Sequence, residues 1–191
     1  MKKKKILVVS QNFYPEQFRI NDICKELVLR GHDVTVLTGL PNYPKGKIFE
    51  GYEGKQKRKE IYEGIKIIRT YERERKSGGA LNLFLNYYSF VLSSKKMVKK
   101  LEKDFDLILV NQLSPVMQTY CALDYKKKFK VPVLLYCLDL WPASLSAGGV
   151  SGGPIYKYFH KVSKKIYSKI NYTDWYTISS TNLSASTTGN S

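Results

Sequence analysis

The sequence predicts an α/β fold, a Rossmann-like, doubly wound and mainly parallel sheet with helices on both faces. Short, continuous apolar runs rich in β-branched residues alternate with segments whose apolar residues recur at helical spacing. Such runs are typical of strands buried on both faces, and their alternation with helices is typical of doubly wound domains. The first strand, helix and second strand fit within residues 5–38, which favours a right-handed, parallel β–α–β unit.

Each element has its own signal. Residues 5–11 (KILVVSQ) predict a strand, residues 20–32 a helix that ends at Gly31, and residues 33–38 (DVTVLT) a second strand. After a long loop the predicted elements are a strand at 64–71, a helix at 80–103, a strand at 105–111, a helix at 115–129, a strand at 131–140, a helix at 152–170 and a strand at 174–179. We expect one domain over residues 1–180 and a polar, disordered tail over residues 181–191.

The chain is strongly basic. Of its 191 residues, 32 are Lys or Arg and 16 are Asp or Glu, which gives a formal net charge of +16. Such an excess indicates an anionic partner, which is a nucleic acid, an acidic lipid surface or a phosphorylated substrate. Lysines that only keep the surface soluble are the alternative. Because no RNP motif, zinc finger or recognisable helix-turn-helix occurs, we expect no specific nucleic-acid partner.

Cysteine usage and hydropathy bear on the compartment. Cys24, Cys121 and Cys137 form no CxxC pair and the chain has two histidines, so we expect a reducing compartment and no metal. The apolar run at residues 6–9 is too short for a signal peptide, and no segment offers the ~20 apolar residues of a membrane span. We therefore expect a cytoplasmic protein.

Ligands of open α/β sheets bind outside the carboxyl ends of the strands. After the first strand, the turn contains Asn12, Arg19 and Asn21, and the chain has no GxGxxG sequence, so NAD binding through that fingerprint is not expected. The amides of a helix N-terminus together with Arg19 offer a site for a phosphate. The alternative is that Arg19 only decorates the surface.

The loop after the second strand is rich in rigid and aromatic residues. Residues 36–52 read VLTGLPNYPKGKIFEGY, and Pro41 and Pro44 restrict the backbone around Asn42 and Tyr43. Rigid aromatic groups with polar tips suit the apolar faces and hydroxyl edges of sugars. A loop packed on the domain surface is the alternative.

Two later strands are also followed by candidate site residues. Ser114 follows the strand at 105–111, and Asp139 and Trp141 follow the apolar run that starts at residue 131. An aspartate that Trp141 partly desolvates is suited to orienting a hydroxyl or stabilising positive charge. A structural hydrogen bond at an N-cap or in a loop is the alternative for Asp139.

The helix predicted at 80–103 carries a stripe that is apolar at one end and cationic at the other. Its members are Leu81, Leu85, Tyr88, Leu92, Lys96, Lys99 and Lys103. Phe84, Tyr87 and Val91 lie on a different face and are expected in the core. An apolar patch rimmed by lysines suits the headgroup zone of an anionic bilayer, and contact with protein is the alternative.

Several of these motifs together resemble the N-terminal half of family 4 glycosyltransferases with the GT-B fold. The resemblance covers about residues 4–180 and is most specific in NYPKGK with its trailing Gly-Tyr at 42–52, and in DLWP at 139–142. The chain is most similar to the bacterial subgroup that builds O-antigen, lipopolysaccharide and capsule repeat units, including N-acetyl-fucosamine transferase-like members.

This resemblance implies a domain that receives a glycan acceptor, often on an undecaprenyl diphosphate carrier, at the inner face of the membrane. Transfer from a nucleotide-sugar would retain anomeric configuration and need no metal or other cofactor. Asn42, Tyr43 and Pro44, with Ser114 and Trp141, would then bind the acceptor. Asp139 would be the catalytic residue beside the reacting sugar, and Asn12, Arg19 and Asn21 would lie in the loop that approaches the donor phosphates. Many relatives have Gly-Gly where this chain has Phe18 and Arg19.

Relatives also carry a second domain that binds the nucleotide-sugar and contains two glutamates eight residues apart. No glutamate pair in this sequence has that spacing. We therefore expect this chain to be inactive alone, either because it is part of a longer or truncated protein or because the donor domain is a separate chain. The alternative is a non-catalytic basic module, either the partner subunit of a split transferase or a binder of nucleic acid or membrane surfaces.

Overall fold

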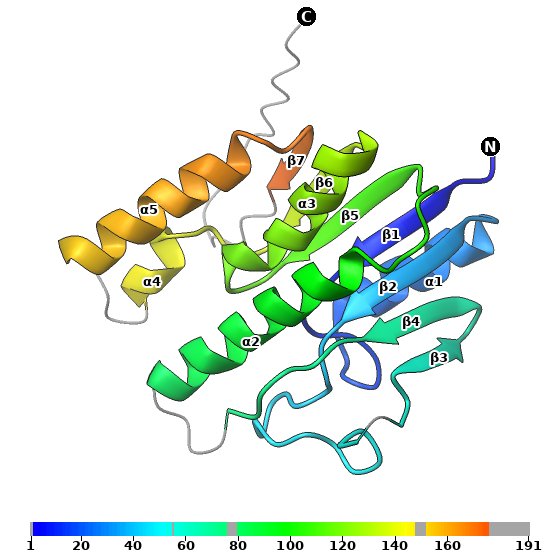
Figure 1. The fold of residues 1–191 in the computed structure, drawn as a ribbon, viewed down its shortest axis with the longest axis horizontal. Helices are drawn as coiled ribbons and strands as arrows, with labels where there is room; N and C mark the ends of the chain where they lie inside the picture. The colour runs from blue at the N-terminus through cyan, green and yellow to red at the C-terminus, as the bar shows by residue number, and fades with distance from the viewer. Residues whose placement is uncertain (1, 55, 76–79, 148–151, 176–191) are drawn as a thin grey trace, which may run out of the picture.

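The computed structural model describes residues 2–54, 56–75, 80–147 and 152–175, and it confirms the predicted fold class. Within these residues a sheet of seven strands has the order β3-β4-β2-β1-β5-β6-β7 (Figure 1). In chain order the elements are β1 (Lys5–Val9), α1 (Arg19–Leu29), β2 (Asp33–Thr38), β3 (Lys59–Tyr62), β4 (Ile65–Arg69), α2 (Ala80–Val98), β5 (Leu107–Gln112), the 3-10 helix η1 (Val116–Thr119), α3 (Tyr120–Phe129), β6 (Val133–Cys137), α4 (Ala143–Ala147), α5 (Gly153–Tyr167) and β7 (Tyr172–Trp175). All neighbouring strands are parallel except the β3–β4 pair.

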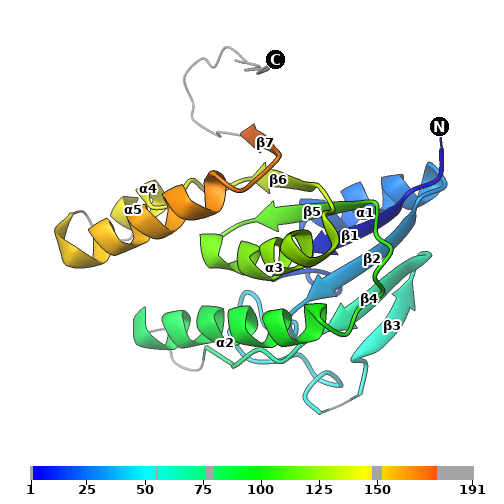
Figure 2. The ribbon, with the colours of Figure 1, turned by 45° about the horizontal axis from the view of Figure 1, so that its top comes forward.

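The sheet is buried on both faces, as the continuous apolar runs predict. In β1, Ile6 and Val8 face a core that includes Cys24 of α1, whereas Leu7 and Val9 face a second core under α2 and α3. Successive side chains of a strand point to opposite faces, so an unbroken apolar run is needed when helices cover both. Figure 2 shows α1 on one face of the sheet and α2 and α3 on the other.

The edge strand β3 is an element that the sequence prediction missed. Residues 59–62, predicted as loop, pair antiparallel with β4 through the two-residue turn at Glu63 and Gly64. Both turn residues have positive φ, 49° and 78°, which is the geometry of a type I′ hairpin. The Glu-Gly pair between two short apolar stretches is a weaker hairpin signal than Asn-Gly. The sequence alone therefore does not distinguish this hairpin from a loop.

Several predicted boundaries are also corrected. The long helix ends at Val98 and not at residue 103, because Leu101 and Phe105 turn inward and become buried. Residues 116–119 form the 3-10 helix η1 before α3, so Pro115 precedes the helical segment. The short helix α4 was not predicted, and the last strand begins at Tyr172. The predicted tail, residues 181–191, lies outside the described residues.

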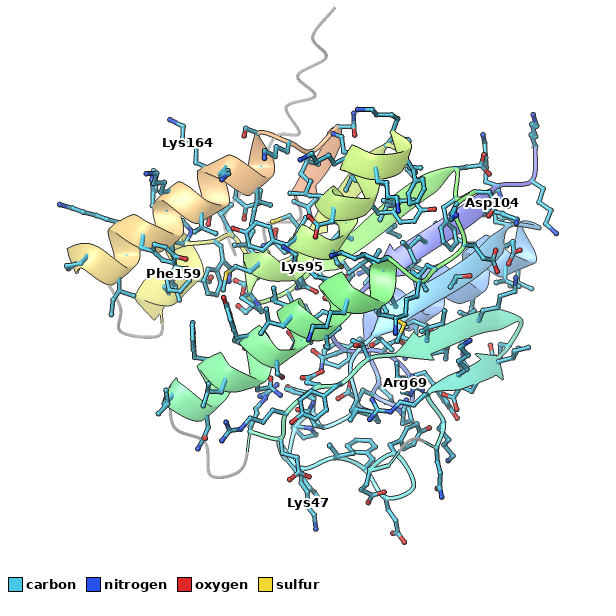
Figure 3. All side chains as sticks on the ribbon, viewed as in Figure 1. Lys47, Arg69, Lys95, Asp104, Phe159 and Lys164 are labelled. Atoms are coloured by element: carbon cyan, nitrogen blue, oxygen red, sulfur yellow. The ribbon has the colours of Figure 1, made fainter. Side chains whose placement is uncertain are left out.

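Two helices project beyond the ends of the strands. In Figure 1 the N-terminal halves of α2 and α5 both extend past the arrow tips of the parallel strands. A third apolar cluster joins these helices, since Val91 of α2 and Phe159 of α5 pack with Val116 and Trp141. Figure 3 shows Phe159 turned inward from α5 and Lys164 pointing away from the same helix. Among the described helices, none is long and apolar enough to cross a membrane.

Candidate functional site at the carboxyl edge of the sheet

Glu16 connects the two loops at the edge where the parallel strands end, which we call the carboxyl edge. Its carboxylate accepts hydrogen bonds from the backbone N–H groups of Asn42 (2.8 Å) and Tyr43 (2.6 Å) in the loop after β2. It also accepts from the N–H of Phe13 (3.3 Å) and the side-chain amide of Asn12 (3.2 Å) in the loop after β1. One buried carboxylate therefore fixes these two loops relative to each other.

Glu72, which follows β4, is the second buried acid of the site. Its Oε1 accepts from the side-chain amides of Gln11 (2.8 Å), Asn86 (2.9 Å) and Asn42 (3.0 Å). The Asn42 amide also donates to the Leu40 carbonyl (2.8 Å), and its side chain is 0% exposed. The prediction that Asn42 contacts the acceptor is therefore corrected. Its side-chain amide points inward and holds the loop to Glu72 and Leu40.

Burial raises the pKa of both acids, because a low-dielectric environment disfavours the charged carboxylate. For Glu16, the N–H groups of Tyr43 and Asn42 offset part of the raised pKa. The pKa of Glu72 is raised to about 8 by burial, although the hydrogen bond from Gln11 works in the opposite direction. A proton on Glu72 at neutral pH removes a second negative charge from this interior.

The three residues predicted for donor phosphates do not act as a group in the structure. The Asn12 amide is bound to the Glu16 carboxylate, and the Asn21 amide donates to the Glu16 carbonyl (2.7 Å). Arg19 is the exposed first residue of α1, and it lines hollows along α1 together with residues such as Asp22 and Glu26. Asn12 and Asn21 thus shape the loop, and phosphate binding by Arg19 stays a prediction.

Asp139, Ser114 and Trp141, which follow two different strands, come together in the structure. The Ser114 hydroxyl donates to Oδ2 of Asp139, and the indole N–H of Trp141 donates to Ser114 Oγ at 3.0 Å. Gln112 fixes the backbone here, because its amide donates to the Asp139 carbonyl at 2.6 Å. The Trp141 ring is buried against Phe159, with ring centroids 5.2 Å apart, so it supports the site and presents mainly its N–H edge.

The pKa of Tyr87 on α2 responds to charged groups from both halves of the site. Burial raises the pKa of its hydroxyl, the charge of Arg75 lowers it, and the charges of Asp139 and Glu72 raise it further. Arg75 lies over the ring of Tyr43, 5.8 Å from its centroid, and the Tyr43 side chain is 46% exposed. Pro44 beside it is also exposed.

Four residues of this site were not found from the sequence. Glu16, Glu72, Arg75 and Tyr87 look like ordinary charged or core positions, because their neighbours in space come from distant parts of the chain. One sequence signal does apply to them: Glu72 and Arg75 follow a strand at its carboxyl end, as Asn42, Ser114 and Asp139 do. Within the described residues, no group of three or more His, Cys, Asp or Glu side chains is arranged to hold a metal ion.

Comparisons with known proteins bear on the fold. A scan against protein-family models and a search of curated proteins both give no match. Among solved structures, Arabidopsis thaliana UGT89C1 complexed with quercetin matches 83% of this chain with a TM-score of 0.50 and 15% identity. CalG4, the calicheamicin glycosyltransferase, matches 88% of this chain with a TM-score of 0.45 and 13% identity.

The likeness to UGT89C1 shows the fold alone, a Rossmann-like α/β domain with a mainly parallel sheet. This chain spans 40% of the length of the UGT89C1 chain and 43% of the length of the CalG4 chain.

Replacing Gly39 by alanine should destabilise the protein. A Cβ at Gly39 would lie 1.7 Å from Oε2 of Glu72, and Glu72 is held by three amides and cannot swing away cheaply. We expect Gly39→Ala to lower the free energy of unfolding by about 1–3 kcal/mol, measured by chemical denaturation. Gly54→Ala is the control, since no atom lies within 4 Å of its added Cβ. Equal stability of the two variants would show that the site is not tightly packed.

The raised pKa of Glu72 predicts a pH-dependent stability. Its ordinary value is 4.5 and its folded value about 8, so between these values the folded state holds a proton that the unfolded state has released. The contribution to stability is complete below about pH 4.5 and is lost as pH rises through 8. We expect Glu72→Gln to reduce the slope over this range by on the order of 1 kcal/mol per pH unit. Glu53→Gln, at an exposed residue, should keep the wild-type slope.

Proposed function

We propose that this chain is the acceptor-binding half of a glycosyltransferase with the GT-B fold, of the retaining, metal-independent family 4 type. Its acceptor would be a lipid-linked glycan in cell-surface polysaccharide biosynthesis, and its nucleotide-sugar donor would bind a second domain or a separate chain. The observation that carries the proposal is that Asp139 with Ser114, after β6 and β5, and Tyr43 with Arg75, after β2 and β4, follow strands that run parallel in one sheet and so lie at its carboxyl edge.

The chemistry of the edge suits a hydroxyl nucleophile. Ser114 donates to Oδ2 of Asp139, which fixes the carboxylate and leaves Oδ1 to accept a hydrogen bond from an acceptor hydroxyl. A carboxylate in that position orients the hydroxyl and holds its proton as the new bond forms. The exposed ring of Tyr43 offers a surface for the apolar face of a sugar. Arg75 beside it supports an acceptor that carries a diphosphate.

An NMR titration of the ¹⁵N-labelled 191-residue chain tests acceptor binding. The probe is N-acetylglucosamine linked through a diphosphate to a short prenyl chain. The indole N–H signal of Trp141, assigned with Trp175→Phe, should shift because that group bonds Ser114 next to Asp139. Asp139→Asn should weaken binding about tenfold or more, the scale of a hydrogen bond to a charged group.

Asp124→Asn is the control, since Asp124 on α3 pairs with Lys95 away from this edge. If NMR signals shift elsewhere but the Trp141 indole signal does not, the acceptor binds at another site. Equal losses of affinity in Asp139→Asn and Asp124→Asn would lead to the same conclusion. Supplied with a nucleotide-sugar and this acceptor, the wild-type chain alone should yield no product, and robust turnover would show that no second domain is required.

We also propose that the protein is cytoplasmic and peripheral on the inner face of an anionic membrane. Leu81, Tyr88 and Leu92 of the predicted stripe are 70%, 45% and 49% exposed on α2, and Leu85 is half-buried. Phe84, predicted in the core, is 43% exposed instead and stacks with Tyr88.

The cationic end of the stripe is shorter than predicted. Lys96 lies on α2 and is exposed, whereas Lys99 and Lys103 follow the end of the helix at Val98 and leave the stripe. Ile155, 61% exposed at the start of α5, adds an apolar side chain on a second helix. The N-terminal halves of α2 and α5 both project at the carboxyl edge (Figure 1). This supports an orientation in which the membrane-facing side would offer the site to a lipid-linked acceptor.

Vesicle sedimentation tests this orientation. With phosphatidylcholine–phosphatidylglycerol vesicles, we expect part of the binding to persist at 1 M salt, where the screening length falls to about 3 Å. Leu81→Glu with Ile155→Glu should lower that salt-resistant binding about tenfold or more, because two apolar contacts are lost. The control is Leu29→Glu, at an 81% exposed leucine at the C-terminal end of α1. An equal loss in the control would argue against a defined membrane face.

A further inference from the structure

A hollow lies between the outer strand pair and the end of α2, apart from the site described above. Its volume is about 360 Å³, within the range of small-ligand sites. Arg58 and Lys59 line it from the start of β3, and Lys96 and Lys100 line it from the last turn of α2 and the residues just after it. The hydroxyl of Ser93 lies in the same wall and donates to the Tyr71 carbonyl at 2.5 Å.

The charge of this hollow is one-sided. Five cationic residues line it, and no Asp or Glu does. The guanidinium of Arg69 is bound to Glu60, which leaves Arg58, Lys59, Lys96 and Lys100. Within the described residues, none of the four forms an ion pair. Lysines on the same elements do find acids, since Lys95 pairs with Asp124 (3.4 Å) and Lys66 with Asp33 (3.2 Å). The absence of acids is therefore local to this hollow.

Lys59, Lys96 and Lys100 are exposed, so their charges are hydrated, whereas the charge of Arg58 is partly desolvated. Arg58 is half-buried, its Nε donates only to the Gly54 carbonyl (3.0 Å), and burial lowers the pKa of its guanidinium. An anion in the hollow would replace lost hydration and reduce the repulsion among the four side chains. Phosphate groups fit best, because each offers several oxygens to several donors and carries more than one charge.

We propose that this hollow binds a phosphate-bearing anion with the charge of a diphosphate. Four positive charges match the several negative charges of a diphosphate, whereas a single carboxylate would leave most of them uncompensated. Ile68 and Met97 form an apolar part of the wall, which leaves room for a non-polar portion of the ligand next to the phosphates. This site does not depend on the proposed acceptor site, since it shares none of the residues assigned there.

Titration of the full chain with inorganic pyrophosphate at constant ionic strength, by calorimetry and amide NMR shifts, tests the proposal. We expect saturable binding with shifts at residues 58–59 and 96–100. Lys59→Gln with Lys100→Gln should weaken binding about tenfold or more, the scale of lost hydrogen bonds to charged groups. The control pair is Lys127→Gln with Lys128→Gln at the end of α3, which removes the same charge from exposed positions and should change affinity less than about twofold.

Equal weakening by the two pairs, or binding that does not saturate, would overturn the proposal, because diffuse attraction to a basic protein would then explain the data. Phosphatidylcholine vesicles with and without phosphatidic acid identify the source of the phosphate. If the hollow pair weakens both pyrophosphate and phosphatidic acid binding, the ligand is a lipid headgroup. If it weakens only pyrophosphate binding, the ligand is soluble. Both results support the site, and thermal unfolding of each variant confirms that it remains folded.

Discussion

The buried carboxylate of Glu16 is the interaction on which the carboxyl edge depends. It accepts hydrogen bonds from two loops that follow different strands, one from residues 12–13 and one from residues 42–43. Loops have few apolar contacts of their own, and their backbone N–H groups need partners when they are buried. A single acid with two oxygens satisfies several of these donors together, so the two loops take one relative position.

Glu72 extends this polar interior toward α2. Its partners Gln11, Asn42 and Asn86 come from the first loop, the second loop and the helix, so a third part of the chain is fixed to the first two. A buried polar network of this kind costs desolvation, and its benefit lies in specifying one geometry. The raised pKa of Glu72 is the sign of that cost. Beside this network Tyr43 is exposed, and the half-buried Arg75 lies over its ring.

The other half of the edge depends on apolar packing. Trp141 is held between Phe159 of α5 and residues of η1, and its one polar atom, the indole N–H, points to Ser114. Asp139 is thereby positioned through a serine and a tryptophan and not through a buried charge. Helix α2 contributes to both halves, to the polar network through Asn86 and to the apolar cluster through Val91.

The α/β class and most strands and helices could be predicted from the sequence, because apolar periodicity is a local property. The contacts of Ser114 with Asp139 and Trp141 came only from the structure. The sequence did not determine the β3 hairpin, the end of α2 at Val98 or the inward role of Asn42. Those depend on which distant groups meet: Glu72 with Asn42, the core with Leu101, and β3 with β4. Whether a polar side chain faces a ligand or a buried acid is decided only when the chain has closed on itself, since the sequence records the donor but not its partner.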